Sequence, residues 1–346
     1  MYPRVSVNIV AWNGMKFIPE LLESIFAQTF VDFSVLIVDN GSSDGAEAYV
    51  REHFPQVAFL RNARNLGFAP AHNQAIRYAI EHWNENDLSD RFVLVTNQDL
   101  IITPTFLEEI VRAAESEPKV GSFQGKLRRA YTENPQDEVF REVVRSERID
   151  STGLMPHRNR TFTDRGAGEM DDGQFDESTD IFGPTGALAL YRASALRDAR
   201  YRDEFFDQDF FSYKEDADLA WRLRHLGWTS RYVPSAVAYH YRGMFGKERM
   251  GWVERIRNRR GKSPVRNWYS TRNHLLLLMK NQRIWSGLLV SPWIFWFELR
   301  RFVYVLFLET STVRAYLAAL GLFPAMARKR ADLWKKRASR NASKAL

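Results

Sequence analysis

The sequence predicts an α/β fold in which a mostly parallel central sheet is covered by helices on both faces. Between Val5 and about Gly125, short runs of β-branched and bulky apolar residues alternate with segments of helical periodicity. Elements that alternate in this way form parallel sheets, because each crossover helix returns the chain across a face of the sheet. The chain has 346 residues, 45% of them hydrophobic, which is enough to fill such a core.

The elements follow from the sequence in order. Strands are predicted in VSVNIVAW, SVLIVD, VAFLRN and FVLVTNQD, and MKFIPELLESIFAQ has the periodicity of a helix. Another helix is predicted to begin at Thr103-Pro104, because proline favours the first helical turn. Between about Arg128 and Asp180 the periodicity fails and at most short strands are expected. A strand and a helix then follow in GPTGALALYRASAL, a helix in KEDADLAWRLRHLGW and a strand in SRYVPSAVAYHYRG.

The sequence divides into a first domain of residues 1–245, with halves 1–125 and 126–245, and a helical extension of residues 246–346. The extension is basic, with twelve Lys or Arg against two Glu between Arg242 and Arg283. Its most apolar stretch, SGLLVSPWIFWFELRRFVYVLFLE, is interrupted by charges at Glu298, Arg300 and Arg301, which disfavours a membrane-spanning helix. A helix lying in the membrane interface is favoured, with Trp293, Trp296, Phe297 and Phe302 as its apolar bulk. The alternative is a buried helix packed on the first domain.

Composition excludes several classes of protein. The sequence has no cysteine, so it has no disulfides, thiolate metal sites or cysteine nucleophiles. Its first residues alternate like a strand and show no signal peptide, which makes the cytosol the default location. The net charge is +7, but the basic residues are separated from the expected cleft and no nucleic-acid-binding signature occurs. The first turn, AWNGMKF, lacks the glycine pattern of a dinucleotide-binding oxidoreductase, and a P-loop is missing too.

Polar residues follow each predicted parallel strand. They occupy Asn13-Gly14, Asp39 to Asp44, Asn65 to Asn73 and Asn97 to Asp99. Parallel strands share a carboxyl edge, so these segments are expected to line one cleft. Asp99 suits a hard cation such as Mg²⁺ or Mn²⁺, whereas an asparagine contributes only a neutral oxygen or a hydrogen bond. As turn residues alone, the triplet Asn97-Gln98-Asp99 would be ordinary.

Two further positions are candidates for chemistry. Glu215 and Asp216 stand at the first turn of a predicted helix whose apolar face is Leu219, Leu223 and Leu226. The pair can be a charged helix cap, which the helix dipole stabilises, or Asp216 can face the cleft as a general base. His240 ends a predicted strand; a lone histidine is more often structural, but imidazole also suits Mn²⁺ beside a carboxylate.

Taken together, seven segments resemble the family 2 inverting glycosyltransferases of the GT-A fold, in order and at about the family's spacing. They are VNIVAWNG, LIVDNGSSDG, NARNLGFAPAHNQAI, LVTNQDL, GPTGALALYRASAL, KEDADLAWRLRHLGW and AYHYRG. The resemblance covers residues 5 to about 245 and is closest to bacterial rhamnosyltransferase-like members that extend O-antigen, cell-wall linker or related polysaccharides. The extension also resembles that of the family members in its basic and aromatic composition.

The resemblance implies a role for each matching residue. Asp39 matches the acid that binds the nucleotide base, beside the backbone of Val10 and Ala11, and Asp44 belongs to the same turn. The segment that closes over the nucleoside and donor sugar is matched by Asn65, Gly67, Phe68 and Asn73. The triplet Asn97, Gln98 and Asp99 stands where the family has its metal-binding Asp-x-Asp. Asp216 matches the catalytic base, Glu215 its acidic neighbour, and His240 a position that completes the metal shell in some members.

The implied reaction is a single displacement that inverts the anomeric carbon of a nucleotide sugar with the help of Mg²⁺ or Mn²⁺. Asn97 departs from the family pattern, since the triplet has lost one carboxylate. Neutral residues also occur at this place among rhamnosyltransferase-like members, which favours dTDP-rhamnose as donor. A UDP-hexose (galactose, glucose or N-acetylglucosamine) donor is the alternative, and a non-catalytic sugar-nucleotide-binding module is a third interpretation.

The expected acceptor is a saccharide on a lipid pyrophosphate. The basic run RIRNRRGKSPVRNWYSTRNH beside an interfacial helix suits such a substrate at an anionic membrane surface. The protein is therefore expected on the cytoplasmic face of the plasma membrane, bound peripherally through its extension. A homodimer is one arrangement that we consider, and no nucleic-acid partner is expected.

Overall fold

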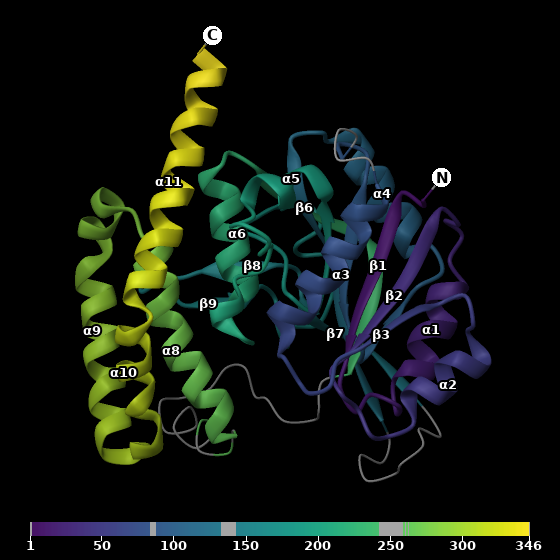
Figure 1. Cartoon of the computed structure of the whole chain (residues 1–346), viewed down its shortest axis with the longest axis horizontal. Coiled ribbons are helices and arrows are strands. Elements are labelled where there is room, and N and C mark those ends of the chain that lie inside the picture. Colours follow the sequence, from purple (N-terminus) through teal and green to yellow (C-terminus); the bar gives the residue numbers. More distant parts are fainter. Residues whose placement is uncertain are drawn as a thin grey trace.

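The structure is a computed structural model that describes residues 2–83, 88–132, 143–241, 259, 261 and 263–345. Ten strands of the described residues form one sheet, whose main path runs β10-β12-β6-β11-β4-β1-β2-β3. Figure 1 shows β1, β2 and β3 of this sheet side by side. The half of the sheet that is built from the first four strands of the chain is parallel throughout. The strands of this half are β1 (Val5–Ala11), β2 (Phe33–Asp39), β3 (Ala58–Arg61) and β4 (Phe92–Asn97). The predicted α/β fold is confirmed.

Helices cover both faces of the sheet because the strand residues alternate between two cores. On β4, Leu94 packs with α1 (Ile18–Phe26) and α4 (Phe106–Ser116), whereas Val93 and Val95 pack with α3 (Phe68–His82). The short helix α2 (Ala46–His53) joins the α1 side through Val50. Helix α4 begins later than predicted, at Phe106, because Pro104 and Thr105 form the turn before it.

Beyond β4 the sheet becomes mixed. Strand β11 (Leu188–Arg192) runs antiparallel to β4 and to β6 (Val120–Thr132), while β12 (Thr229–Tyr241) runs parallel to β6. The expectation of only short strands after Arg128 was wrong, since β7 (Val143–Ser151) has nine residues and pairs with β6. Alternation in β7 is hidden because only one of its ends is buried. Shorter strands are β5 (Leu100–Ile102), β8 (Leu154–Pro156), β9 (Phe162–Asp164) and β10 (Asp180–Ile181).

The remaining helices extend the fold away from the sheet. Helix α5 (Ala193–Ala199) and helix α6 (Glu215–His225) cover the α3 side, and Leu219, Leu223 and Leu226 are buried there as predicted. Helices α8 (Pro264–Asn281) and α11 (Phe323–Ala345) contact the outer side of α6. Helices α9 (Ile284–Leu308) and α10 (Arg314–Gly321) lie further out (Figure 1).

The helical extension and the first domain share a hydrophobic core. Phe210, Ala217 and Trp221 pack with Leu276 of α8 and Met326 of α11 in one cluster. The predicted boundary near residue 245 falls outside the described residues and stays a prediction. In the described part of the chain, every helix is too short or too polar to cross a membrane.

Candidate active site

The triplet Asn97-Gln98-Asp99 lies where β4 ends, at the carboxyl edge of the parallel strands. Gln98 holds the end of β1: its Oε1 accepts a hydrogen bond from the Trp12 backbone N–H at 2.8 Å, and its Nε2 donates to the Trp12 carbonyl at 3.2 Å. A Cβ on Gly14 would come within 2.2 Å of the Gln98 amide, so a larger residue there would displace this side chain. Gln98 therefore fixes the backbone that follows Val10 and Ala11.

Asp99 faces His240 across the β5–β12 pairing, in which Leu100 is opposite His240. His240 Nε2 lies 3.3 Å from Asp99 Oδ1, and its Nδ1 lies 2.8 Å from Asp150 Oδ2. Burial disfavours a charged imidazole, but the Asp99 charge and the Asp150 hydrogen bond outweigh it and raise the pKa of His240 to about 10. Asp150 is fully buried, whereas the Asp99 side chain is 28% exposed, so only Asp99 reaches toward the cleft.

This cluster fits a divalent cation. No group of three or more acidic or histidine side chains in the described residues is arranged as a ready metal site. Asp99 and His240 are nevertheless two adjacent ligands of the right kind, and a cation would displace the proton on His240 Nε2. The Asp150 carboxylate would then orient the imidazole through Nδ1, as outer-shell carboxylates commonly do for metal-bound histidines.

The predicted nucleotide-binding turn follows β2 and is internally braced. Asp39 is buried, and its Oδ2 accepts a hydrogen bond from the Ser42 backbone N–H at 3.0 Å while the Ser42 hydroxyl donates to Oδ1. Asp44 Oδ2 accepts from the Met15 backbone N–H at 2.7 Å, which ties this turn to the one after β1. The turn thus reaches the cleft as a rigid unit, with Asp39 already engaged by Ser42.

The predicted donor loop of residues 65–73 meets the segment before α6. Gly67 has φ of +89°, and a Cβ there would lie 2.6 Å from the Phe211 ring, so the loop can approach Phe211 only through glycine. Phe68 stacks edge-on against Phe206, with ring centroids 5.4 Å apart. Asn73 is fully buried: it accepts from the Phe206 N–H at 2.8 Å and donates to the Phe206 carbonyl at 2.7 Å. Asn73 therefore joins the two segments.

Asn65 has a local contact in the same loop. Its Oδ1 accepts a hydrogen bond from the Gly67 backbone N–H at 2.8 Å, which closes the turn before α3. The loop bearing Asn65, Gly67 and Phe68 is thus shaped before any ligand binds. Asn97, the neutral residue of the triplet, is half-buried at the end of β4.

The chain enters α6 through an unusual turn. Phe211, Tyr213 and Lys214 all have positive φ angles, of 62°, 72° and 70°, a region that side-chain-bearing residues rarely occupy. Strain of this kind persists only where the surroundings enforce it and is common near functional sites. Asn273 of α8 enforces it here, because its Nδ2 donates to the carbonyls of Phe210, Ser212 and Tyr213 at 2.8 to 2.9 Å. The turn sets the direction of the two acids that follow.

Asp216 is held by backbone alone. Its Oδ2 accepts a hydrogen bond from the Gly186 N–H at 3.0 Å and its Oδ1 from its neighbour Ala217 at 2.7 Å. Ala187, next to Gly186, accepts from the Asn97 N–H at 2.9 Å, so Asp216 lies beside the end of β4. The structure thereby brings the triplet and the predicted base to the same edge of the sheet.

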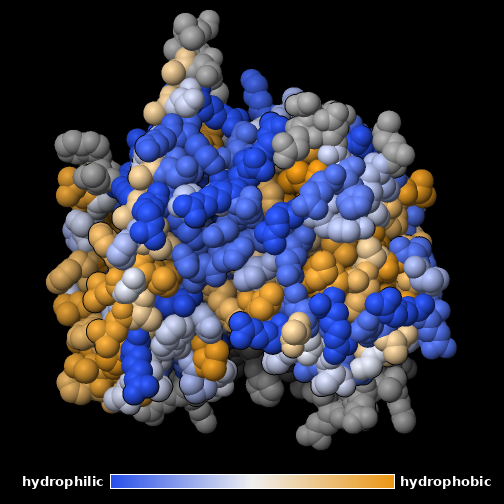
Figure 2. Space-filling view, in the orientation of Figure 1, coloured by the Kyte–Doolittle hydropathy of each residue, from blue (hydrophilic) through white to orange (hydrophobic). Residues whose placement is uncertain are grey.

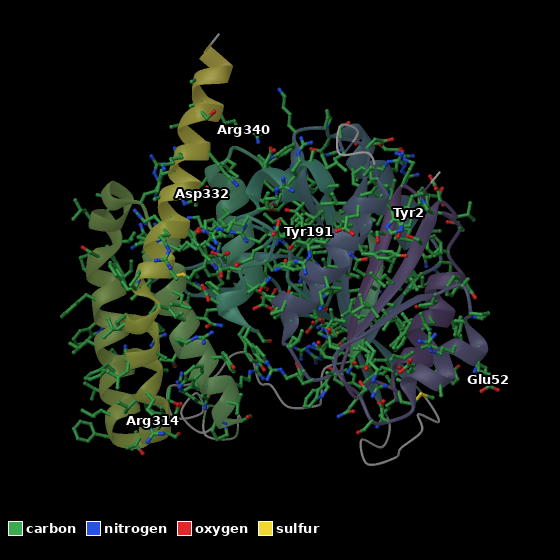
Figure 3. All side chains as sticks on the ribbon, viewed as in Figure 1. Tyr2, Glu52, Tyr191, Arg314, Asp332 and Arg340 are labelled. Atoms are coloured by element: carbon green, nitrogen blue, oxygen red, sulfur yellow. The ribbon has the colours of Figure 1, made fainter. Side chains whose placement is uncertain are left out.

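Burial dominates the electrostatics of this pair. It raises the pKa of Asp216, against the effect of the two backbone hydrogen bonds, and together with the charge of Asp216 it raises the pKa of Glu215 to about 8. The charge of Lys214 lowers the pKa of both acids but does not outweigh burial, and burial together with Arg301 lowers the pKa of Lys214 itself to about 8. Tyr191, labelled near the centre of Figure 3, is fully buried, and its pKa is raised by burial and by the charges of Asp216 and Glu215.

Sequence reasoning missed several residues that build the site. Asp150 lies in the region where periodicity failed, and its side chain gave no signal before β7 was known to pair with β6. The hydrogen bonds of Asn273 join the extension to the turn before α6, and no local sequence pattern predicts such a long-range contact. The proximity of Asp99 and His240, by contrast, follows from two strand ends that the sequence did indicate.

The sequence matches a known protein family over most of the first domain. The sequence model described as Glycosyl transferase family 2 matches residues 6–200, which is more than half of the chain. The chain belongs to this glycosyltransferase family. A curated relative, the N-acetylglucosaminyl-diphospho-decaprenol L-rhamnosyltransferase of Mycobacterium tuberculosis, is 28% identical over 244 residues, which cover 68% of this chain and 75% of the relative.

Solved structures of glycosyltransferases share the fold. The Staphylococcus aureus TarS 1–349 complex with UDP superposes with a TM-score of 0.51 at 17% identity, covering 99% of this chain and 91% of TarS 1–349. A Pyrobaculum calidifontis mannosyltransferase in complex with GDP-Man and Mn²⁺ superposes with a TM-score of 0.50 at 16% identity, covering 99% of this chain and 88% of the other. These similarities support the GT-A fold that the sequence predicted.

Proposed function

We propose that this glycosyltransferase moves a sugar, L-rhamnose from dTDP-L-rhamnose, to a hydroxyl of a lipid-linked saccharide with inversion of the anomeric carbon. The observation that carries the mechanism is Asp216: a carboxylate with a raised pKa, held by the Gly186 and Ala217 N–H groups beside the end of β4. A base needs a fixed position and a pKa nearer neutrality than that of an ordinary aspartate, and Asp216 has both.

In the proposed step, Asp216 takes the proton of the acceptor hydroxyl as that oxygen forms a bond to the anomeric carbon. The bond from the anomeric carbon to the diphosphate oxygen breaks at the same time, and the nucleoside diphosphate leaves with the electron pair. Glu215 is expected to stay protonated at neutral pH, since its pKa is about 8, so it adds no second negative charge beside the base. Inversion follows because the displacement is single.

We propose Mg²⁺ or Mn²⁺ as the cofactor, with Asp99 and His240 as protein ligands and Asp150 orienting His240. When bound, such a cation offsets negative charge on a departing diphosphate. Asp99 holds the cation on the cleft side, while Asp150 remains buried behind the imidazole. The neighbour bound to GDP-Man and Mn²⁺ supports this choice of cation.

The remaining predicted residues are proposed to hold the donor. Asp39 and Asp44 brace the turn that is proposed to bind the nucleotide base, beside Val10 and Ala11. The loop over the nucleoside and sugar is formed by Asn65, Gly67, Phe68 and Asn73. Asn97 and Gln98 shape the edge of the cleft. The mycobacterial relative, named as an L-rhamnosyltransferase, supports rhamnose. A UDP-hexose donor is the second candidate, supported by the UDP complex of TarS.

The acceptor is proposed to be a saccharide on a lipid diphosphate, which the name of the mycobacterial relative supports. The product is proposed to be O-antigen, cell wall or a related polysaccharide. The extension supports a peripheral position on the inner face of the plasma membrane. Large apolar side chains on α9 and α10 face outward, and Figure 2 shows them gathered along the edge that these helices occupy. The most exposed include Leu289, Phe295, Phe307, Leu317 and Leu320.

Two of the three charges that interrupt α9, Glu298 and Arg301, turn inward, whereas Arg300 is exposed. Arg301 is buried and pairs with Glu298, and Glu298 Oε1 lies 3.1 Å from His274 Nε2 on α8. Two of the three charged residues of this stretch therefore leave the outer face of α9 apolar. Such a face suits a helix lying in the membrane interface while the opposite face packs on α8.

The decisive test is release of nucleoside diphosphate from a panel of dTDP-, UDP- and GDP-sugars with Mg²⁺ or Mn²⁺, with and without a lipid-diphosphate acceptor. We expect turnover of dTDP-rhamnose that requires the cation and is absent in Asp216→Asn. Turnover of a UDP-hexose instead would keep the mechanism and replace the donor. A full-length protein that binds a sugar nucleotide but never turns it over would support the non-catalytic binding module.

A further inference from the structure

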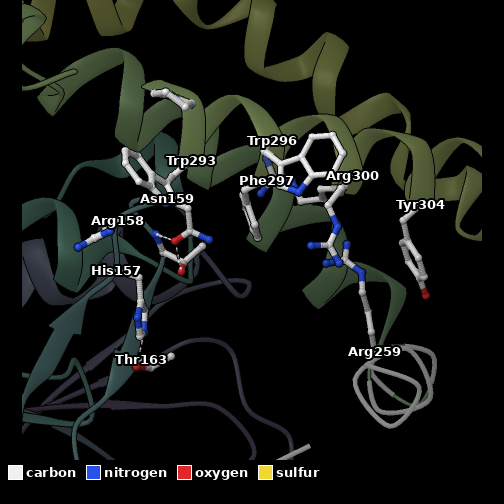
Figure 4. Close-up of a pocket in the computed structure, with 13 residues that line it drawn as sticks. His157, Arg158, Asn159, Thr163, Arg259, Trp293, Trp296, Phe297, Arg300 and Tyr304 are labelled. Carbon is white, nitrogen blue, oxygen red and sulfur yellow. Dashed lines mark hydrogen bonds between the residues drawn. The ribbon is translucent and has the colours of Figure 1, made fainter. Parts of the chain in front are cut away.

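A second concave site lies between α9 and the β8–β9 hairpin, away from the donor-binding edge of the sheet. Its volume is about 1110 Å³. One wall is aromatic and comes from α9, with Trp293, Trp296 and Phe297, and the facing wall is the hairpin loop with His157 and Asn159 (Figure 4). A cavity of this size holds a substantial part of a small-molecule ligand.

The charged groups that line the cavity are all basic. They are Arg158, Arg259, Arg300 and Arg301, and no Asp or Glu is among the lining residues of the described chain. Arg259 is paired with Glu309 at 2.6 Å and Arg301 with Glu298, outside the lining. For Arg158 and Arg300, the described residues provide no carboxylate partner. Two guanidinium groups thus remain available for an anion, and phosphate oxygens match the guanidinium fork.

These arginines lie at two ends of the cavity, and the pair at one end, Arg259 and Arg300, favours a bound anion. Arg158 lies over the ring of Trp293, with its guanidinium carbon 5.2 Å from the ring centroid, which holds it at the rim of the cavity. Figure 4 shows Arg259 and Arg300 extending toward one another on the other side of Trp296. Like charges that converge in one cavity repel each other, and a bound anion relieves that repulsion.

The cavity also borders the proposed base by two routes. Thr163 of β9 lines the cavity, and the paired strand β8 reaches the segment that holds Asp216, because the Leu154 N–H donates to the Gly183 carbonyl at 2.8 Å, three residues before Gly186. On the α9 side, Glu298 lies 3.1 Å from His274 of α8, which is next to Asn273, the residue that holds the turn before Asp216. A ligand in the cavity could therefore extend a sugar toward Asp216.

The apolar face of α9 continues from the aromatic wall. Trp293 and Trp296 are 46% and 58% exposed, and Phe295 beside them is 66% exposed. An anionic headgroup of an amphiphile would contact the arginines inside the cavity, and its apolar chain would contact the exposed side chains of α9. A soluble anion would contact only the arginines.

We propose that this cavity binds the diphosphate of a lipid-linked acceptor, with Arg158 and Arg300 on the phosphate oxygens and the lipid chain along the exposed face of α9. The assignment rests on the proposed function, because it takes the acceptor to be a lipid diphosphate. It adds the site at which that substrate is recognised, next to the base but separate from the donor and its cation.

The test measures binding of farnesyl diphosphate to the full-length protein without any nucleotide sugar. The variant is Arg158→Gln with Arg300→Gln, and the matched control is Arg314→Gln with Arg328→Gln, two exposed arginines of α10 and α11 outside the cavity. Removing either guanidinium, with its charge-assisted hydrogen bonds to phosphate, should weaken binding about tenfold. We expect affinity to fall by about a hundredfold in the cavity variant and to stay unchanged in the control.

Further probes separate the parts of the proposal. Farnesol and inorganic pyrophosphate should each bind far more weakly than farnesyl diphosphate, since each engages only one surface. Equal affinity of the cavity variant and the control for farnesyl diphosphate would overturn the assignment, as would inorganic pyrophosphate binding as tightly as the amphiphile. If the wild type turns over no donor while the arginine-dependent binding holds, the proposed function fails and the lipid-diphosphate site stands.

Discussion

Two carboxylates on opposite sides of α6, Asp216 and Asp218, differ in their partners and in the direction of their pKa shifts. Asp216 faces the cleft, contacts only backbone N–H groups and has a raised pKa because of burial. Asp218, two residues later, faces the extension and lies 2.9 Å from Lys280 and 2.8 Å from Arg222. Burial alone would raise its pKa too, but the charges of Lys280 and Arg222 lower it.

The difference separates a carboxylate with a structural role from the one that we propose as the base. Asp218 belongs to a buried network in which Lys280 also bonds Asp207 at 2.6 Å, and Lys329 of α11 contacts Asp207 and, at 2.8 Å, Glu204. This network joins α8 and α11 to the first turn of α6. Because these ion pairs hold the start of α6, Asp216 can keep its position without a salt bridge of its own. The following experiments test that division.

The largest expected effect is that of Asp216→Asn on turnover. Loss of a general base should lower the rate of transfer by about 10²- to 10⁴-fold, because the acceptor hydroxyl then keeps its proton. The amide can still accept a hydrogen bond from Gly186, so the melting temperature should change little. Steady-state kinetics together with thermal unfolding check both expectations, and a variant with near-wild-type turnover would contradict the role of Asp216.

Lys280→Met should have its main effect on stability. Removing one partner of a buried ion network typically costs about 3–5 kcal/mol, and here it leaves Asp207 and Asp218 with fewer counter-charges. We expect the free energy of unfolding in urea to fall by about that amount. Lys335→Met, at an exposed position of the same extension, is the control and should be neutral. Equal stability of the two variants would show that the network does not fasten the helices.

Asp150→Asn is expected to act through the cation. Loss of an outer-shell carboxylate commonly weakens metal affinity about 10- to 100-fold, since the imidazole of His240 is no longer oriented. The concentration of Mn²⁺ that gives half-maximal activity should rise accordingly, while the rate at saturating Mn²⁺ should recover much of its wild-type value. Unchanged Mn²⁺ dependence would remove His240 and Asp150 from the proposed cation site.

The smallest expected effect is that of Glu215→Gln on the pH dependence of stability. The pKa of Glu215 is raised from 4.5 to about 8, so between these pH values the folded state keeps a proton that the unfolded state has lost. Wild-type stability should therefore decline as pH rises through this window, and the variant should lose less. Melting temperatures at both ends of the window measure this, and an identical decline in the two proteins would show that Glu215 is not protonated in the fold.

The sequence predicted the parts of the site that lie on regular elements. Asp99 and His240 follow or end strands with clear apolar patterns, and Asp216 starts a helix with a clear apolar face, so the element that carries each residue could be predicted. That all three belong to one site was implied by the family resemblance. Asp150 could not be found this way, because β7 is recognisable only through its pairing with β6. Lys280 looked like one more basic residue of the extension.

Long-range contacts also decide which helices of the extension are buried, and the sequence alone did not show this. Its sequence suggested either an interfacial helix or a buried one, and the structure separates these properties between helices. Helix α8 is buried against α6 while α9 exposes most of its large apolar side chains. Long-range charge pairing decides which helix does which, as with Glu298, which turns toward His274 and Arg301. Periodicity within one helix carries no record of such partners.

The configuration of the new glycosidic linkage tests the central claim most directly. The wild-type protein would be given the sugar nucleotide that it turns over and a lipid-diphosphate acceptor, and the product's anomeric configuration would be determined by NMR and compared with that of the donor. A single displacement with Asp216 as base predicts inversion. Retention would contradict it, because two successive displacements, or attack from the side of the leaving diphosphate, would then be needed.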